Sequence, residues 1–392
     1  MTVTARSKPT EIRALAGARA FPPLILVMFH FSEGHGYRHF WPLDFPAGRG
    51  YLWVEFFFCL SGFILTHVYG ARLTALRTAN GYRGFLKARL MRLYPLHLFM
   101  LFVVAAMVLL TRGFAELGGY HSIFDLKYHQ DVSLEGGLLS LVLMQGWGFM
   151  DRLTWNGVSW FVSVEWALCL IFPVLLTLAQ GGVRRGLALI AAGLALLLTL
   201  DLLSPNGLDI TFDFGLLRGV ADFTVGVGMA VLYRAWKPRD TLPDWNHSLI
   251  QLAVMGVLLY AIYNTGWTHT HRDIFTVVPM LALVLALSFD RGIVADALKT
   301  RLPQRLGEWS YAIYIGQTFG LLLIRVFAQR LYPPAETPML GTTFGALIWW
   351  LEPFGLVIFC TAWGAFLATY IEQPAARWLK RRLDPQRIPA AS

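Results

Sequence analysis

A series of long apolar runs dominates this sequence and restricts what it can fold into. The runs lie near residues 14–33, 51–69, 93–111, 158–179, 186–203, 214–233, 248–265, 274–289, 308–328 and 343–371. Each approaches or exceeds the roughly 20 residues that an α-helix needs to cross a bilayer. Because backbone polar groups in hydrocarbon must be bonded internally, such runs form helices. The sequence predicts an all-α polytopic membrane protein with about ten transmembrane helices.

The composition agrees with a membrane protein and argues against a nucleic-acid-binding one. Of the 392 residues, 56% are hydrophobic and 15% are charged, whereas soluble domains carry about 25% charged residues. The net charge is +9, but the basic residues gather in short loops between the apolar runs. That pattern is typical of cytoplasmic loops beside anionic lipid. We therefore expect the lipid bilayer as a partner and no nucleic acid.

The loop charges also predict how the chain is oriented. Lysines and arginines crowd the segments near 72–92, 184–185, 234–239, 291–305 and 377–382, whereas the intervening loops are mixed or acidic. All the basic segments fall on one side of the membrane if both termini are cytoplasmic. We predict one membrane domain over residues 10–375, with short cytoplasmic tails at 1–9 and 376–392.

One apolar run is too short to be a crossing. Residues 136–150 are apolar, but counting them as a span would break the alternation of loop charge. Irregular backbone at membrane depth has to be covered by protein or line a wet cavity. We therefore expect a re-entrant or interfacial helix on the outer side.

Several ionisable residues lie inside the apolar runs, where a charged group costs roughly 2.5 to 3.5 kcal/mol. His30 lies near the outer end of the first run, and Glu165 and Glu55 lie at similar depth in the fourth and second. Arg89 and Arg92 lie at the inner mouth of the third. The sequence thus predicts two ends of one path, an outer site with a base and carboxylates and an inner mouth with paired arginines.

Each of these residues also has a structural interpretation. A histidine near a helix end can reach the headgroups and carry no chemistry. Glu165 can be the partner of a buried arginine, because intramembrane carboxylates normally need one. Arg89 and Arg92 can be ordinary cytoplasmic anchors of the positive-inside kind.

Two other buried carboxylates are predicted to be structural. We expect Glu55 to pair with Arg19 or with another cation. Asp222 lies four residues after Arg218 on the same predicted helix, so we expect these two side chains to pair with each other.

Six short segments carry a family resemblance, and they occur in order along nearly the whole chain. They are Gly17–Arg19 with Val27–Phe31, Val54–Leu65, Phe85–Leu96, Trp160–Trp166 with Phe172 and Pro173, Leu306–Ile315, and Tyr370–Pro374. Together they resemble the motifs of the acyltransferase-three family of bacterial membrane O-acyltransferases. Any one segment is weak, but six in family order are specific.

The resemblance implies a multi-pass enzyme of the bacterial inner (cytoplasmic) membrane. Such an enzyme moves an acyl group, commonly acetyl, from cytoplasmic acyl-CoA to a hydroxyl of a sugar, polysaccharide or glycolipid at the outer face. Acyl-CoA, most often acetyl-CoA, is then the co-substrate, and the carbohydrate or glycolipid is the acceptor. No metal is implied by the sequence, because His121 and His129, and likewise His269 and His271, lie in loops without a matched ligand set.

The resemblance also assigns roles to individual residues. It implies that His30 is catalytic and that Arg19 is its motif companion. It implies that Arg89 and Arg92 bind the phosphates of coenzyme A, and that Glu165 is a carboxylate of the site. An imidazole suits the task of a general base near neutral pH, although a route through an acyl-histidine intermediate is equally compatible with the sequence.

Other positions complete the predicted site and mark two departures from the family. Ser163 and Glu55 are included as further site residues. Ala16 stands where the family often has an acidic residue, so an ion pair at that point is absent. Gln317 stands near the place of a second family histidine, which we expect to be auxiliary.

Two alternatives stay open from the sequence. A secondary transporter or flippase of a lipid-linked sugar or acyl carrier would share the spans and the buried charges. Transporters commonly show inverted repeats with broken paired helices, and the sequence shows no such repeat. A membrane O-acyltransferase with a different acceptor, such as another lipid or a small molecule, would differ only in what it modifies.

Overall fold

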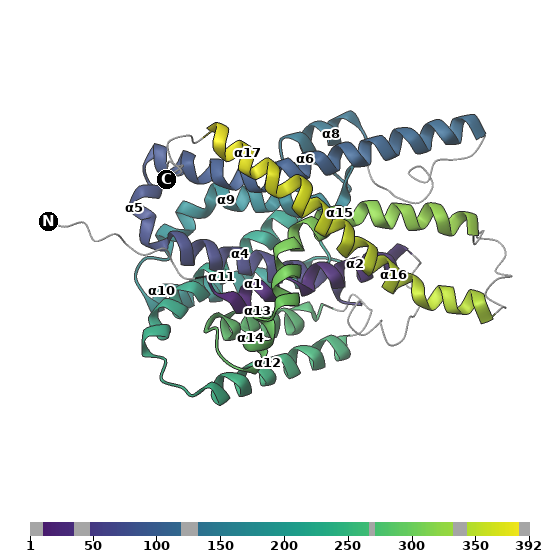
Figure 1. Cartoon of the computed structure of the whole chain (residues 1–392). Helices are drawn as coiled ribbons and strands as arrows, with labels where there is room; N and C mark the ends of the chain where they lie inside the picture. Colours follow the sequence, from purple (N-terminus) through teal and green to yellow (C-terminus); the bar gives the residue numbers. More distant parts are fainter. Residues whose placement is uncertain (1–10, 35–47, 119–131, 266–270, 332–342, 384–392) are drawn as a thin grey trace, which may run out of the picture.

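The computed structural model describes residues 11–34, 48–118, 132–265, 271–331 and 343–383, and these ranges contain helices but no β-strand. The α-helices are α1 (Arg13–Ala18), α2 (Phe21–Gly34), α4 (Trp53–Tyr69), α5 (Leu73–Leu76), α6 (Ala79–Gly118), α8 (Leu134–Leu141), α9 (Trp160–Leu178), α10 (Val183–Leu203), α11 (Gly215–Trp236), α12 (Asp244–Thr265), α13 (Asp273–Ser288), α14 (Ile293–Leu298), α15 (Arg301–Leu331), α16 (Thr343–Leu367) and α17 (Gln373–Leu383). Figure 1 shows the long helices packed side by side as one bundle.

The prediction of an all-α polytopic membrane protein is confirmed. Within the described ranges, eight helical stretches are long and apolar enough to cross a membrane, and α13 is a shorter apolar helix. The number of crossings and the side on which the termini lie stay predictions. Of the predicted tails, residues 1–9 lie outside the described residues, whereas the other begins as helix and continues α17 to Leu383.

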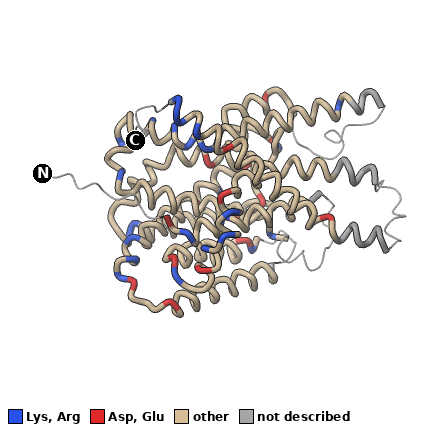
Figure 2. The backbone as a smooth tube through the Cα atoms, in the orientation of Figure 1, with Lys and Arg blue, Asp and Glu red and all other residues tan. Residues whose placement is uncertain are grey.

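The described lysines and arginines gather toward the end of the bundle at which α5 lies (Figure 2). This arrangement is the one that the loop charges predict. A second set of charged residues, of both signs, lies in the middle of the bundle among the apolar helices (Figure 2). Those buried charges need partners or a function, because lipid and protein interior solvate them poorly.

The first apolar run is broken in the middle. Helix α1 ends at Ala18 and α2 begins at Phe21, so Arg19 lies in the break. The cause is local, because Pro22 and Pro23 have no N–H with which to bond the carbonyls one turn earlier. The cationic side chain of Arg19 therefore extends from the junction between the two helices.

The short run at 136–150 forms the eight-residue helix α8 followed by turns rather than a crossing. Ser133 caps the helix, since its hydroxyl accepts a hydrogen bond of 3.1 Å from the Gly136 amide. His97 on α6 bonds the Ser140 carbonyl at 2.8 Å. These contacts attach the segment to α6, as expected for irregular backbone covered by protein.

Close packing of α4 against α11 depends on two glycines. A Cβ atom at Gly226 would lie 1.9 Å from the Cys59 carbonyl oxygen, and one at Gly62 would lie 2.2 Å from that of Phe223. Small residues allow such backbone contact between membrane helices. The approach brings the polar groups of the two helices within reach of each other.

An ion pair joins these helices near their N-terminal ends. Arg218 donates to both carboxylate oxygens of Glu55, at 2.8 and 2.6 Å, and also to the carbonyls of Tyr51 and Ile210. Both side chains are buried. The predicted partner of Glu55 is therefore not Arg19 but the other cation that the sequence left unspecified.

The predicted pair between Asp222 and Arg218 is wrong. Both carboxylate oxygens of Asp222 are buried without a hydrogen-bond partner among the described residues. Side chains on a helix point toward its N-terminus, so the Arg218 guanidinium extends away from Asp222 and toward Glu55. Residues one turn apart on a helix can attract each other. Arg218 instead donates two hydrogen bonds to the carboxylate of Glu55 on another helix, and such two-fold charge-assisted bonds are strong.

Candidate active site

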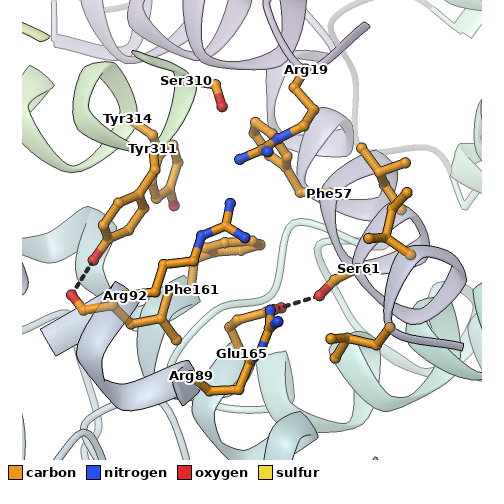
Figure 3. Close-up of a pocket in the computed structure, with 14 residues that line it drawn as sticks. Arg19, Phe57, Ser61, Arg89, Arg92, Phe161, Glu165, Ser310, Tyr311 and Tyr314 are labelled. Atoms are coloured by element: carbon orange, nitrogen blue, oxygen red, sulfur yellow. Dashed lines mark hydrogen bonds between the residues drawn. The ribbon is translucent and has the colours of Figure 1, made fainter. Parts of the chain in front are cut away.

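Helices α4, α6, α9 and α15 and the break between α1 and α2 together enclose a cavity of about 120 Å³ (Figure 3). Its polar lining consists of Arg19, Ser61, Arg89, Arg92, Glu165, Ser310 and Tyr311. Aromatic and aliphatic side chains form the rest of the wall. Charged groups from segments far apart in the sequence therefore meet in one cavity, at which Arg19 and Arg89 are half-buried and Arg92 is exposed.

Three arginines dominate the cavity. Arg89 and Arg92 lie one turn apart on α6, and Arg19 reaches in from the broken first run (Figure 3). Arg89 lies 5.8 Å from the ring centres of both Tyr69 and Phe85. Within the described part of the chain, none of the three guanidinium groups donates a hydrogen bond or forms an ion pair. Converging cations without bonded partners make a site for an anion.

Glu165 is the carboxylate of this cavity. The Ser61 hydroxyl donates a hydrogen bond to its Oε1 atom (Figure 3). Its Oε2 atom is buried without a hydrogen-bond partner among the described residues. Glu165 was predicted to lie with His30 at the outer site, but it lies in one cavity with Arg89 and Arg92. Depth along a helix does not fix which way a side chain faces.

His30 is bonded to Gln317 at a different place. The distance from the His30 Nδ1 atom to the Gln317 Oε1 atom is 3.0 Å. The amide nitrogen of Gln317 donates to the Tyr314 carbonyl at 2.9 Å, so its oxygen faces the imidazole. An amide oxygen only accepts, so Nδ1 is the donor in this hydrogen bond, and in the neutral imidazole the lone pair is then on Nε2. That tautomer is the one a general base requires.

His30 and Gln317 do not line the cavity. Tyr314, which does line it, lies one helical turn before Gln317 on α15. The predicted site residues therefore form two groups on adjacent turns, with the arginines and Glu165 in one and the imidazole in the other. His30 is half-buried and Gln317 is fully buried.

The two remaining predicted site residues lie outside the cavity lining. The Ser163 hydroxyl donates to the Leu143 carbonyl and accepts from the Gly146 amide, at 2.9 and 3.0 Å. It thereby holds the turns after α8 against α9. Glu55 is occupied by its ion pair with Arg218.

Sequence reasoning did not assign Ser61, Ser310, Tyr311 or Glu372, although all four lie in the recognised motifs. Glu372 closes a π-helical turn, Ala368–Glu372, between α16 and α17. Its carboxylate attracts Arg19 and Arg92, and π-helical turns are frequent at functional sites. The sequence signal that could have identified Glu372 is that it is an acidic residue directly before the basic segment 377–382.

A family model described as an acyltransferase domain matches residues 12–370. The chain is 34% identical over 182 residues to "Protein 2 in picA locus" of Rhizobium radiobacter, which covers 46% of this chain and 86% of that protein. It is 25% identical over 408 residues to acyltransferase MdmB of Streptomyces mycarofaciens, which covers 95% of this chain and 93% of that protein. No solved structure matches.

Proposed function

This chain belongs to the acyltransferase-domain family, and on that basis we propose a specific reaction for it. An acyl group, most simply acetyl, passes from cytoplasmic acyl-CoA to a hydroxyl of a sugar, polysaccharide or glycolipid at the outer face of the bacterial inner membrane. The observation that supports this proposal is the convergence of three arginines on one cavity.

Coenzyme A is an anionic ligand, and the arginine cavity has the chemistry to hold it. Arg89 and Arg92 present planar donor groups from one face of α6, and Arg19 faces them. A guanidinium group can donate two parallel hydrogen bonds to one phosphate, whereas the ammonium group of a lysine cannot. Glu165 and Glu372 limit the mutual repulsion of the three cations. The basic end of the bundle (Figure 2) is the cytoplasmic side in this scheme.

His30 acts on the acceptor in this proposal. Its Nε2 atom takes the proton of the hydroxyl as the oxygen attacks the thioester carbonyl carbon. The carbon–sulfur bond then breaks, and the proton passes from Nε2 to the departing sulfur of coenzyme A. Gln317 orients the ring through Nδ1, the task that a carboxylate performs in catalytic triads. Its amide cannot stabilise the imidazolium as a carboxylate would, so its contribution is mainly orientation.

Replacing both Arg89 and Arg92 with alanine is expected to weaken coenzyme A binding by about 100-fold. Each lost charge-assisted hydrogen bond removes about 1.5 kcal/mol, and about 1.4 kcal/mol is a factor of ten in affinity. Equilibrium binding of coenzyme A to the detergent-solubilised protein measures the effect.

The matched control for this pair replaces two other arginines. Arg72 and Arg83 are exposed and do not line the cavity. Their double alanine variant loses the same net charge but should bind coenzyme A as the wild type does. If the double alanine variant of Arg89 and Arg92 binds coenzyme A as tightly as the wild type, those residues only determine the topology of the chain in the membrane.

A further inference from the structure

Three aromatic rings lie together in the lining of the arginine cavity. They are Phe57 of α4, Phe161 of α9 and Tyr314 of α15, and all three line the cavity (Figure 3). Their ring centres are 5.8 Å apart for Phe57 and Phe161, 6.3 Å for Phe57 and Tyr314, and 5.3 Å for Phe161 and Tyr314. Each ring therefore contacts both others, and we call the set the aromatic layer.

The helix registers place this layer between the polar part of the cavity and His30. Phe57 lies one turn before Ser61, and Phe161 lies one turn before Glu165, the residue that Ser61 contacts. Helices α4 and α9 thus run in the same direction, with both rings on the same side of the polar pair. On the third helix, the order along the chain is Tyr311, which lines the cavity, then Tyr314, then Gln317 with its bond to His30.

One wall of the layer is fixed by hydrogen bonds. The Tyr314 hydroxyl donates to the Val158 carbonyl at 2.9 Å. The Asn156 side chain donates to the Ile315 carbonyl at 3.1 Å and accepts from Thr318 at 2.6 Å. These bonds tie this turn of α15 to the segment before α9. The rings of Phe57 and Phe161 carry no polar group and form no hydrogen bond. They are therefore the rings of the layer that can be displaced.

We infer that the aromatic layer selects the acyl group by size. The inference rests on the proposed function, because the layer lies between the cavity proposed to hold coenzyme A and the turn of α15 that carries Gln317, the partner of His30. A two-carbon acetyl group requires little displacement of a phenyl ring. A longer chain requires more, and well-packed rings resist displacement because they lose contacts with their neighbours.

Alanine at Phe57 or at Phe161 is expected to raise the ratio of hexanoyl to acetyl transfer by about tenfold or more. A difference of one methylene group in an apolar site already discriminates by about 10-fold, and removing a ring opens more space than that. The assay uses membranes that carry the native acceptor, radiolabelled acetyl-CoA and hexanoyl-CoA, and the label recovered in ester linkage. Leucine variants at the same positions guard against loss of folding and should shift the ratio in the same direction by less.

The matched control is Phe63→Ala. Phe63 is a buried phenylalanine on the same helix as Phe57, but it packs against Tyr233 and does not line the cavity. Its loss should lower stability without changing the ratio. An unchanged ratio in the Phe57 and Phe161 variants of an active enzyme overturns the inference alone. A wild type that transfers neither acyl group and binds no coenzyme A overturns the proposed function, and this inference with it.

Discussion

Replacing His30 with alanine is expected to lower acyl transfer by about 10²- to 10⁴-fold, the contribution of a positioned general base. In the proposed mechanism the imidazole accepts the proton of the acceptor hydroxyl, which is a poor nucleophile near neutral pH. Coenzyme A binding should stay unchanged, because His30 does not line the arginine cavity. The measurement is initial-rate transfer from labelled acetyl-CoA, with coenzyme A affinity determined on the same preparation.

A second histidine provides the control for this variant. His67 lies in α4, where it packs against Phe63 and Tyr233 and does not line the cavity. Its replacement by alanine should leave transfer intact. Full activity in His30→Ala would show that the imidazole takes no part in the mechanism. His30 would then be an ordinary histidine near the end of a helix.

Breaking the buried ion pair between Glu55 and Arg218 should have the largest effect on the stability of the protein. Alanine at Glu55 leaves the Arg218 guanidinium buried without its carboxylate partner, which costs about 3 to 5 kcal/mol. Thermal unfolding in detergent, followed at one protein concentration, reports the loss. Replacing both residues with apolar side chains, as in Glu55→Leu with Arg218→Met, should recover most of it, because no uncompensated charge remains.

An exposed ion pair on another helix calibrates that result. Arg305 and Glu308 are 3.1 Å apart and both are exposed, so Glu308→Ala should cost less than about 1 kcal/mol. If Glu55→Ala unfolds at the temperature of the Glu308 variant, the buried pair contributes little and α4 is held against α11 by apolar packing alone.

The positions of the helices were predictable because membrane crossing depends on length and hydropathy, which the sequence states directly. The break in the first run was not predicted, although Pro22 and Pro23 were visible, because prolines are tolerated in membrane helices when neighbours satisfy the freed groups. Arg19 lies at that break and lines the cavity.

The composition of the site was predicted better than its grouping. Arg19, Arg89, Arg92 and Glu165 do meet in one cavity, but counting residues from a helix end placed Glu165 beside His30. The depth of a residue along a helix does not determine the direction in which its side chain points. The direction in which Glu165 faces follows from the packing of α9 on α4, which brings Ser61 to it, and no local pattern encodes that contact.

The most direct test of the central claim is the sidedness of the reaction. Sealed inside-out membrane vesicles receive radiolabelled acetyl-CoA on their exposed cytoplasmic face, and ester-linked label is then measured inside and outside. We predict label on acceptor in the lumen, protected from an added esterase until detergent is present, and almost none with His30→Ala. Label confined to the exposed face, or equal luminal label in the His30 variant, would contradict the account.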